Sequence, residues 1–236
     1  MKHLILADGH FVGAPGEATR WRRLLDKAND QGVAELSVLG DFFELWIGLE
    51  GQQEPWHAEF FAPLYALKLT GVRLRYVVGN KDYFVERWNR QHGLFDEVHQ
   101  TGCIVDSALG PLHLAHGDLV NHRDHQYRLW RSFSRSWAAA LLMRAMPAKM
   151  LRAVAARMAR QLKVTNRYHK SYFPESELRA RARELTAGAA TLIYGHFHRH
   201  SDMTEGDKRI ITLPFLGGET AGILLDESGF SLFDDT

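Results

Sequence analysis

Five apolar stretches of the sequence each end in aspartate, asparagine or histidine, and most of these ends also contain a glycine. A buried strand does not tolerate a charged side chain in its interior without a partner. At the carboxyl end of a strand the chain leaves the sheet, and polar side chains can point into a shared crevice. The ends carry, in chain order, Asp8 with His10, Asp41, Asn80 with Asp82, His116 with Asp118, and His196 with His198. Apart from the glycines, these are residue types that bind divalent metal ions, so we expect a metal centre where the strands end.

The spacing within these ends fits two ions rather than one. Asp8 and His10 are two residues apart, so both side chains leave the same side of an extended chain, and His196 and His198 repeat the arrangement. Asp41 has one carboxylate oxygen for each of two ions. Two ions about 3.5–4 Å apart stabilise both the attacking and the leaving oxygen of a phosphoryl transfer. Mixed carboxylate, amide and imidazole donors suit Mn²⁺, Fe²⁺ or Zn²⁺, and the oxygen ligands favour Mn²⁺. Simple capping of strand ends is the alternative, but capping does not require histidine.

The hydrophobic pattern predicts the elements that position these residues. Strands are expected at 2–7, 34–39, 73–78, 102–105, 112–115, 191–194, 210–213, 221–225 and 230–233, and helices at 16–31, 56–69, 84–90 and 174–187. The early alternation of strand and helix favours parallel pairing, whereas 102–115 is typical of a hairpin and the later strands of mostly antiparallel pairing. Ser176 is a possible cap of the last helix. We therefore expect an α/β fold of two facing mixed β-sheets flanked by helices.

A long helical segment without strands interrupts this pattern. It runs from 124 to 170, and Pro147 should end one helix and begin another. We interpret 121–172 as a helical insertion, with 1–120 and 173–236 forming the core domain. The insertion contains twelve Arg or Lys and one Asp, a net charge of +11, which leaves −10 for the rest of a chain whose net charge is +1. This division indicates two surfaces with different partners, although the basic insertion could also be a merely solvated face.

Composition limits the class of protein. The chain has 236 residues and is 45% hydrophobic, which is enough for a folded core. Cys103 is the only cysteine, so a disulfide framework and a zinc–thiolate site are excluded, and a reducing cytoplasm is expected. The first strand reaches Asp8 too soon for a signal peptide, and no apolar run has the roughly 18 residues of a membrane-spanning helix. We expect no nucleic-acid partner, and the sequence does not indicate an oligomeric state.

In order and spacing, the patterns DxH, GD, GNxD, HGD and GHxH resemble those of the calcineurin-like metallophosphoesterases, over nearly the whole chain. This resemblance implies an αββα sandwich with two divalent ions. It implies that the first ion is held by Asp8, His10, Asp41 and His198, and the second by Asp41, Asn80, His116 and His196. Asp82 and Asp118 would orient ligands from behind.

A closer resemblance lies in GDFFELWIG at 40–48, which is similar to the GDxFExWxG block of the UDP-2,3-diacylglucosamine hydrolases of lipid A biosynthesis. The stretch from His116 to Arg131 is similar to the same family's HGDx₅DxxYxxxR, and the insertion matches in position and length. In that family the insertion is a lid over the acyl chains and the sugar. The resemblance implies hydrolysis of UDP-2,3-diacylglucosamine to UMP and 2,3-diacylglucosamine 1-phosphate, by a cytoplasmic enzyme in peripheral contact with the inner membrane.

The same resemblance assigns residues. It implies catalytic roles for Asn80, Lys81 and His116 and substrate contacts for Asn80, Lys81, Asp124, Tyr127, Arg131, Asn166, Lys170 and His196. Lys81 departs from the family pattern GNRD, and many metallophosphoesterases have a histidine there that protonates an alkoxide leaving group. A lysine ammonium holds its proton too tightly for that task at neutral pH but binds phosphate well. Because a phosphate leaving group needs no proton, Lys81 favours pyrophosphate cleavage.

Other interpretations remain open. The enzyme could be a phosphodiesterase or phosphatase acting on another nucleotide or phosphoester, or the chain could be a non-catalytic scaffold whose basic insertion binds a membrane or protein partner. The complete ligand set argues against a scaffold. Trp46 and Phe42 are expected to pack in the wall of the site. Five further histidines are interpreted as surface or lid residues rather than ligands, namely His3, His57, His113, His169 and His200.

Overall fold

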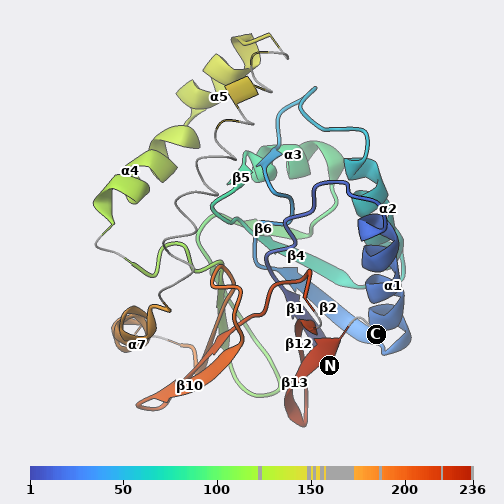
Figure 1. Ribbon diagram of the computed structural model, residues 1–236. Coiled ribbons are helices and arrows are strands. Elements are labelled where there is room, and N and C mark those ends of the chain that lie inside the picture. Colours follow the sequence, from blue (N-terminus) through green and yellow to red (C-terminus); the bar gives the residue numbers. More distant parts are fainter. Residues whose placement is uncertain are drawn as a thin grey trace.

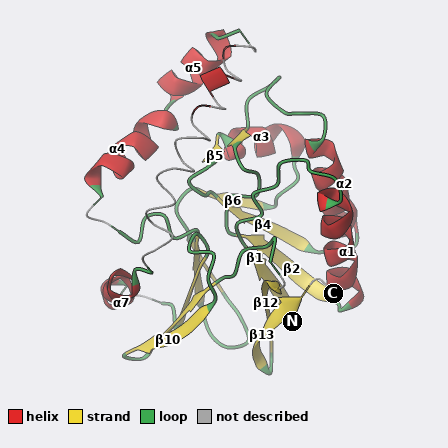
Figure 2. Ribbon diagram, viewed as in Figure 1, coloured by secondary structure: helices red, strands yellow, loops and turns green. Residues whose placement is uncertain are grey.

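The computed structural model describes residues 1–121, 124–147, 150, 153–154, 157, 173–185, 188–218 and 220–234. Two β-sheets face each other in the middle of the molecule, with helices on the outer side of each (Figures 1 and 2). The expected α/β sandwich is therefore confirmed. Asn166, Lys170 and His169 lie outside the described residues, as does most of the insertion after Pro147.

The first sheet has the strand order β13-β12-β1-β2-β4-β6. Strands β1, β2, β4 and β6 are parallel, as the strand–helix alternation predicts, and β12 and β13 extend the sheet by antiparallel pairing next to β1. The bounds are β1 (Lys2–Leu6), β2 (Val33–Val38), β4 (Arg73–Val77), β6 (Glu97–His99), β12 (Thr220–Asp226) and β13 (Gly229–Asp234).

The second sheet has the order β10-β11-β9-β8-β7. Strands β7 and β8 form the expected hairpin, but β9 is parallel to both β8 and β11, so the later part of the chain is less antiparallel than predicted. A short parallel pair, β3 with β5, had no signal in the hydrophobic pattern. The bounds are β3 (Trp46–Ile47), β5 (Asp82–Tyr83), β7 (Cys103–Val105), β8 (Leu112–Ala115), β9 (Thr191–Tyr194), β10 (Ser201–Glu205) and β11 (Lys208–Thr212).

Alternation along the strands divides the core into layers. On β1, Ile5 faces the second sheet and packs with Ile193 and Ile211, whereas Leu4 and Leu6 pack under the helices on the other face. Those helices are α1 (Glu17–Asp30), α2 (His57–Leu69) and α3 (Val85–His92), while α7 (Glu175–Glu184) covers the second sheet. Phe42 and Trp46 are buried in the first layer, as expected.

Three sequence interpretations are wrong. His3 and His57 are only 4% exposed, so neither is a surface histidine. His3 shares a hydrogen bond of 2.8 Å with the hydroxyl of Ser37 on the neighbouring strand, and His57 stacks on Phe43 with ring centroids 4.2 Å apart. Ser176 does not cap α7, because the helix begins one residue earlier with Pro174 at its N-cap position.

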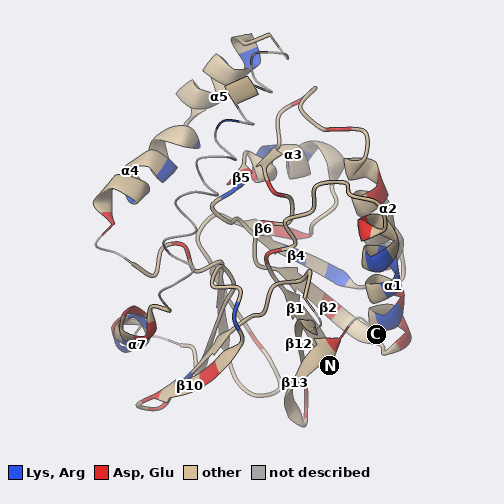
Figure 3. Cartoon of the chain, in the orientation of Figure 1, with Lys and Arg blue, Asp and Glu red and all other residues tan. Residues whose placement is uncertain are grey.

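The described part of the insertion includes two helices, α4 (His125–Ser134) and α5 (Trp137–Ala145), which project above the sandwich (Figure 1). Side chains of Asp124 and Ser136 cap their N-termini, so α5 begins as a separate helix after α4. Ala140 of α5 packs with Ile47 and Leu49 of the core. Figure 3 shows Lys and Arg on both helices, consistent with the basic character of the segment.

Candidate dimetal site at the strand ends

The ends of β1, β2, β4, β8 and β9 meet at one edge of the two sheets, and the predicted ligands gather there in two groups. In the first group, Nε2 of His10 lies 3.0 Å from Nε2 of His198, and Oδ1 of Asp8 lies 3.6 and 3.3 Å from these two nitrogens. Asp8 is fully buried, and its Oδ1 has no hydrogen-bond partner. An unpartnered buried carboxylate oxygen facing two imidazole nitrogens is a geometry suited to binding a cation.

The second group lies against the first. Nε2 of His116 is 2.9 Å from Oδ1 of Asn80, 3.2 Å from Nδ1 of His196 and 3.7 Å from Oδ1 of Asp41. The donor atoms of Asp8, Asp41 and His116 lie close enough together to share one ion. Asp8 thus belongs to both groups, while the predicted bridging by Asp41 stays a prediction.

The backbone at these residues is strained. Among the described residues other than glycine, positive φ angles occur at Phe84 and at five predicted ligands, which are Asp8, His10, Asp41, His196 and His198. Their φ values lie between 46° and 69°, a left-handed conformation that side chains with a Cβ rarely adopt. Such strain persists where the surrounding structure enforces it, and it is concentrated at functional sites.

Two glycines allow the strand ends to approach closely. A Cβ on Gly40 would lie 2.5 Å from the backbone of Gly79, and a Cβ on Gly79 would lie 2.4 Å from Oδ1 of Asp41. Gly40 also has φ of 78°. The glycines beside the predicted ligands therefore have a packing reason, which is to let the strand ends that carry Asp41 and Asn80 approach each other.

Hydrogen bonds prepare His116 for a metal ion. Its Nδ1 donates a hydrogen bond of 2.7 Å to the carbonyl oxygen of Leu39, so Nε2 is the ring nitrogen that would bind an ion. Burial lowers the pKa of this imidazole, but Asp41, Asp8 and Asp118 outweigh it and raise the pKa to about 8. Burial and the neighbouring His116 lower the pKa of His196 to about 4, so that ring is neutral at pH 7.

Asp82 and Asp118 support the site from behind, without belonging to either donor group. Oδ2 of Asp82 accepts hydrogen bonds from the backbone amides of Asp41 and Gly79, at 3.0 and 2.7 Å. Burial and the adjacent Asp41 raise the pKa of Asp82 to about 6. Oδ2 of Asp118 accepts from Arg131 Nε at 2.8 Å and from the hydroxyl of Tyr127.

Lys81 lies at the margin of the first group and is only 3% exposed. Its Nζ lies 3.1 Å from Nδ1 of His10 and 3.0 Å from Oε2 of Glu44. Its backbone amide donates to Oδ1 of Asp41 at 2.8 Å. The lysine is thus fixed beside the site by a carboxylate that the sequence analysis did not single out, although Glu44 lies within the GDFFELWIG block.

Three residues predicted to contact the substrate form hydrogen bonds with other residues of the protein. Asp124 caps α4, and Tyr127 and Arg131 bind Asp118. Arg131 also donates to the carbonyl oxygen of Gln100 at 2.8 Å. These contacts attach α4 to the strand ends, and a direct contact of these residues with substrate stays a prediction. Asn166 and Lys170 are not among the described residues.

Sequence reasoning missed two further residues at the site. The ring of Phe215 stacks on the imidazoles of His10 and His198, with centroids 6.1 and 5.5 Å apart. Arg135, at the junction of α4 and α5, donates to the carbonyl oxygen of Gly79 at 2.6 Å and lies over the ring of Tyr83. No local pattern indicates either residue, because folding brings each from a distant part of the chain.

The donor set fits two divalent cations. Two buried carboxylates, one amide oxygen and four imidazoles converge, and one carboxylate oxygen has no partner within the protein. Oxygen and imidazole nitrogen are the ligands that Mn²⁺, Fe²⁺ and Zn²⁺ accept, and the buried carboxylates need a compensating positive charge.

Solved structures share this fold. A phosphoesterase from E. coli, YfcE, aligns with a TM-score of 0.51 at 18% identity, covering 100% of this chain and 94% of the other. An archaeal phosphodiesterase aligns with the same TM-score at 14% identity, covering 99% of each chain. Together with the paired sheets and the ordered strand ends, these alignments place the fold among the calcineurin-like phosphoesterases.

Curated sequences narrow the class. The chain is 30% identical to a UDP-2,3-diacylglucosamine hydrolase of Azotobacter vinelandii over 242 residues, which covers 98% of each chain. It is 29% identical to that of Hahella chejuensis over 247 residues, covering 99% of this chain and 97% of the other. No family model matches the sequence. The chain belongs to the UDP-2,3-diacylglucosamine hydrolases, a family of metal-dependent hydrolases within the calcineurin-like class.

Proposed function

We propose that this chain hydrolyses the pyrophosphate bond of UDP-2,3-diacylglucosamine, giving UMP and 2,3-diacylglucosamine 1-phosphate. The observation that carries the proposal is the pair of donor groups at the strand ends, which share the buried carboxylate of Asp8. Relatives that align over 97% or more of both chains are named for this substrate. We propose that each of the two donor groups binds one divalent ion.

Bound at these groups, two divalent ions supply positive charge and an activated water for attack on the α-phosphate. We infer Mn²⁺ as the physiological ion, because carboxylate and amide oxygens share the site with imidazole. The chain's own residues hold and orient the reacting groups. Asn80, His116 and His196 face the crevice together, and Lys81 places a cation beside His10 to bind the phosphate oxygens.

We propose that the insertion, residues 121–172, is a lid over the site. Its basic residues extend the positive charge that Lys81 provides at the site. Arg131 and Arg135 connect it to the strand ends on which Gly79 and Asn80 lie. The described apolar side chains of the lid are unusually exposed, among them Trp137 at 80% and Phe133 at 60%. An exposed apolar surface next to basic residues suits the acyl chains and the anionic head of a lipid.

The same surface supports peripheral contact with the inner membrane. Leu129, Leu141 and Leu142 are more than half exposed, and Arg128 and Arg144 lie on the same two helices. Apolar residues flanked by cations are typical of helices that lie in a membrane interface. Among the described residues, no helix is both long and apolar enough to cross a membrane.

Substrate selectivity tests the proposal. With Mn²⁺, wild-type protein should release UMP from UDP-2,3-diacylglucosamine orders of magnitude faster than from UDP-N-acetylglucosamine, because only the acylated substrate uses the lid. The difference should shrink sharply when residues 133–163 are replaced by a short Gly/Ser linker. Equal rates on the two nucleotides would contradict the lipid substrate and leave a dimetal phosphoesterase of other specificity.

A further inference from the structure

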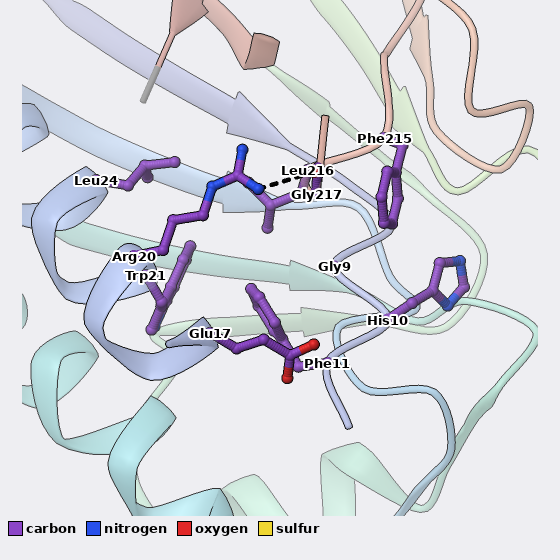
Figure 4. A pocket seen from close by; sticks show the side chains of 10 residues that line it. All are labelled: Gly9, His10, Phe11, Glu17, Arg20, Trp21, Leu24, Phe215, Leu216 and Gly217. Carbon is purple, nitrogen blue, oxygen red and sulfur yellow. Dashed lines mark hydrogen bonds between the residues drawn. The ribbon is translucent and has the colours of Figure 1, made fainter. Parts of the chain in front are cut away.

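A cavity of about 180 Å³ opens next to the first donor group, between α1 and the loop that leads into β12 (Figure 4). Three aromatic side chains line it, Phe11, Trp21 and Phe215, together with Leu24. Arg20 and Glu17 of α1 bring the polar groups, and His10 connects the cavity to the candidate metal site. The proposed catalytic roles leave this cavity without a use.

The position of the cavity relative to the lid is informative. In the sheet order β12-β1-β2-β4-β6, the donors Asp8, Asp41 and Asn80 follow β1, β2 and β4. The lid attaches at the β4 and β6 end, whereas the cavity lies at the β1 and β12 end. Figure 1 accordingly shows α1 on the side of the molecule opposite α4 and α5.

When the pyrophosphate of the substrate is bound at the metal site, the two halves of the substrate extend from that site in different directions. Accepting the proposed function, the diacylglucosamine half extends under the lid, so the nucleoside half extends towards β1. We propose that the cavity beside α1 binds the uracil ring of the nucleotide and so selects the half of the substrate that leaves as UMP.

The size and lining of the cavity fit one planar heteroaromatic ring. Its volume is below the roughly 300–1,000 Å³ of pockets that enclose whole drug-sized ligands, so it suits a single ring. Aromatic walls favour stacking with a base. The Arg20 guanidinium donates to the carbonyl oxygens of Gly217 and Gly218, which fixes the loop that forms one wall. Carboxylate Oε2 of Glu17 accepts from the amides of Val12 and Ala14, each at 3.0 Å, and fixes the other.

Trp21 provides a direct reporter, since its indole N–H donates to the carbonyl oxygen of Phe60 at 3.0 Å while its ring lines the cavity. The experiment records ¹H–¹⁵N spectra of the tryptophan indoles of the Mg²⁺-loaded protein, with the Trp21 signal assigned from Trp21→Phe. UMP should shift the Trp21 signal and leave that of Trp137 on the lid unchanged. Inorganic phosphate, which lacks the ring, should not shift Trp21.

Two variants provide a matched comparison. Leu24→Phe places a larger side chain at the cavity, whereas Leu25→Phe enlarges the next residue of the same buried helix face, which does not line the cavity. Leu24→Phe should weaken UMP binding about 10-fold or more and retain hydrolysis of bis(p-nitrophenyl) phosphate, which carries no nucleobase. Leu25→Phe should retain both. If both variants lose UMP binding, overpacking of the helix face is the cause of the loss. The shift of the Trp21 signal in the wild-type protein then decides whether UMP binds at the cavity.

An unchanged Trp21 signal at saturating UMP, or unchanged UMP affinity in Leu24→Phe, would overturn the nucleobase site. These outcomes are distinct from failure of the proposed function. Cleavage of UDP-2,3-diacylglucosamine without a UMP shift at Trp21 would contradict only the nucleobase site. A UMP shift in a protein that does not cleave the lipid would contradict only the proposed substrate.

Discussion

Individual side chains at the strand ends combine burial, strain and unpartnered atoms in a way that ordinary packing does not require. Asp8 is buried with an unpartnered oxygen, and its backbone is left-handed with φ of 57°. Its other oxygen accepts from the amide of His196 at 2.6 Å, so the carboxylate joins the two sheets. Asp8 shares one donor group with His10 and the other with His116. The charge of two cations accounts for this combination, because it stabilises carboxylates that the interior otherwise destabilises.

Removal of Asp41 tests the two-ion arrangement. Asp41→Ala should lower both metal content and hydrolysis of bis(p-nitrophenyl) phosphate more than His10→Ala or Asn80→Ala, because the sequence pattern predicts that Asp41 binds both ions. The loss should exceed the roughly 10–100-fold typical of residues that only support a ligand. Metal content by mass spectrometry and turnover are the measurements. Wild-type activity in Asp41→Ala would contradict the site.

Lys81 tests the chemistry of the leaving group. Lys81→Ala should slow cleavage of the pyrophosphate by about 10²-fold, since it removes a charge that stabilises the transition state. Lys81→His should gain activity on alkyl phosphodiesters relative to pyrophosphates, because an alkoxide leaving group needs a proton and a phosphate does not. The ratio of kcat/KM for the two substrate types is the measurement. An unchanged ratio in Lys81→His would refute the argument.

At the scale of elements, a buried polar row crosses the parallel strands of the first sheet. His3 on β1 bonds Ser37 on β2, whose hydroxyl lies 3.3 Å from Nη1 of Arg75 on β4. Arg75 in turn forms ion pairs with Glu35 and with Glu97, at 3.0 and 2.9 Å. Partners on four adjacent strands satisfy these side chains, and this row replaces apolar packing between the two sheets.

His3 predicts a pH dependence of stability. Burial, and secondly the charge of Arg75, lower its pKa from 6.5 to about 3. The unfolded chain therefore binds a proton below pH 6.5 that the folded chain does not bind, so this contribution to stability is complete above pH 6.5 and falls towards pH 3.

Urea unfolding in the presence of EDTA, at pH 7 and pH 5, measures this effect. Wild-type protein should lose about 2 kcal/mol more free energy of unfolding between these pH values than His3→Gln, which has no titrating ring. His200→Gln, at an exposed position, is the matched control and should behave as wild type. Equal losses in wild type and His3→Gln would show that His3 is not held neutral.

Much of the fold and site could be predicted because the signals are local. The apolar runs, the helix amphipathicity and the polar strand ends each occupy a few consecutive residues. Glu44 and Phe215 were missed because their roles depend on contacts with Lys81 and His10 that form only on folding. His3 was misread for the same reason, since its hydrogen-bond partner lies 34 residues away on the next strand.

At the scale of the whole molecule, three regions lie in a row along the edge of the first sheet where its parallel strands end. The lid attaches over β4 and β6, the donor groups lie in the middle, and the aromatic cavity lies beside β1 and β12. Each region suits one part of a substrate with acyl chains, a pyrophosphate and a nucleobase. The arrangement therefore explains both the position of the basic insertion and the cavity next to His10.

Hydrolysis of UDP-2,3-diacylglucosamine in ¹⁸O-labelled water, with wild-type protein and Mn²⁺, tests the central claim most directly. Mass spectrometry of the two products locates the label. The account predicts one ¹⁸O in UMP, none in 2,3-diacylglucosamine 1-phosphate, and no reaction after chelation of the metal. Label in the sugar phosphate, cleavage that persists without divalent metal, or no cleavage at all would contradict it.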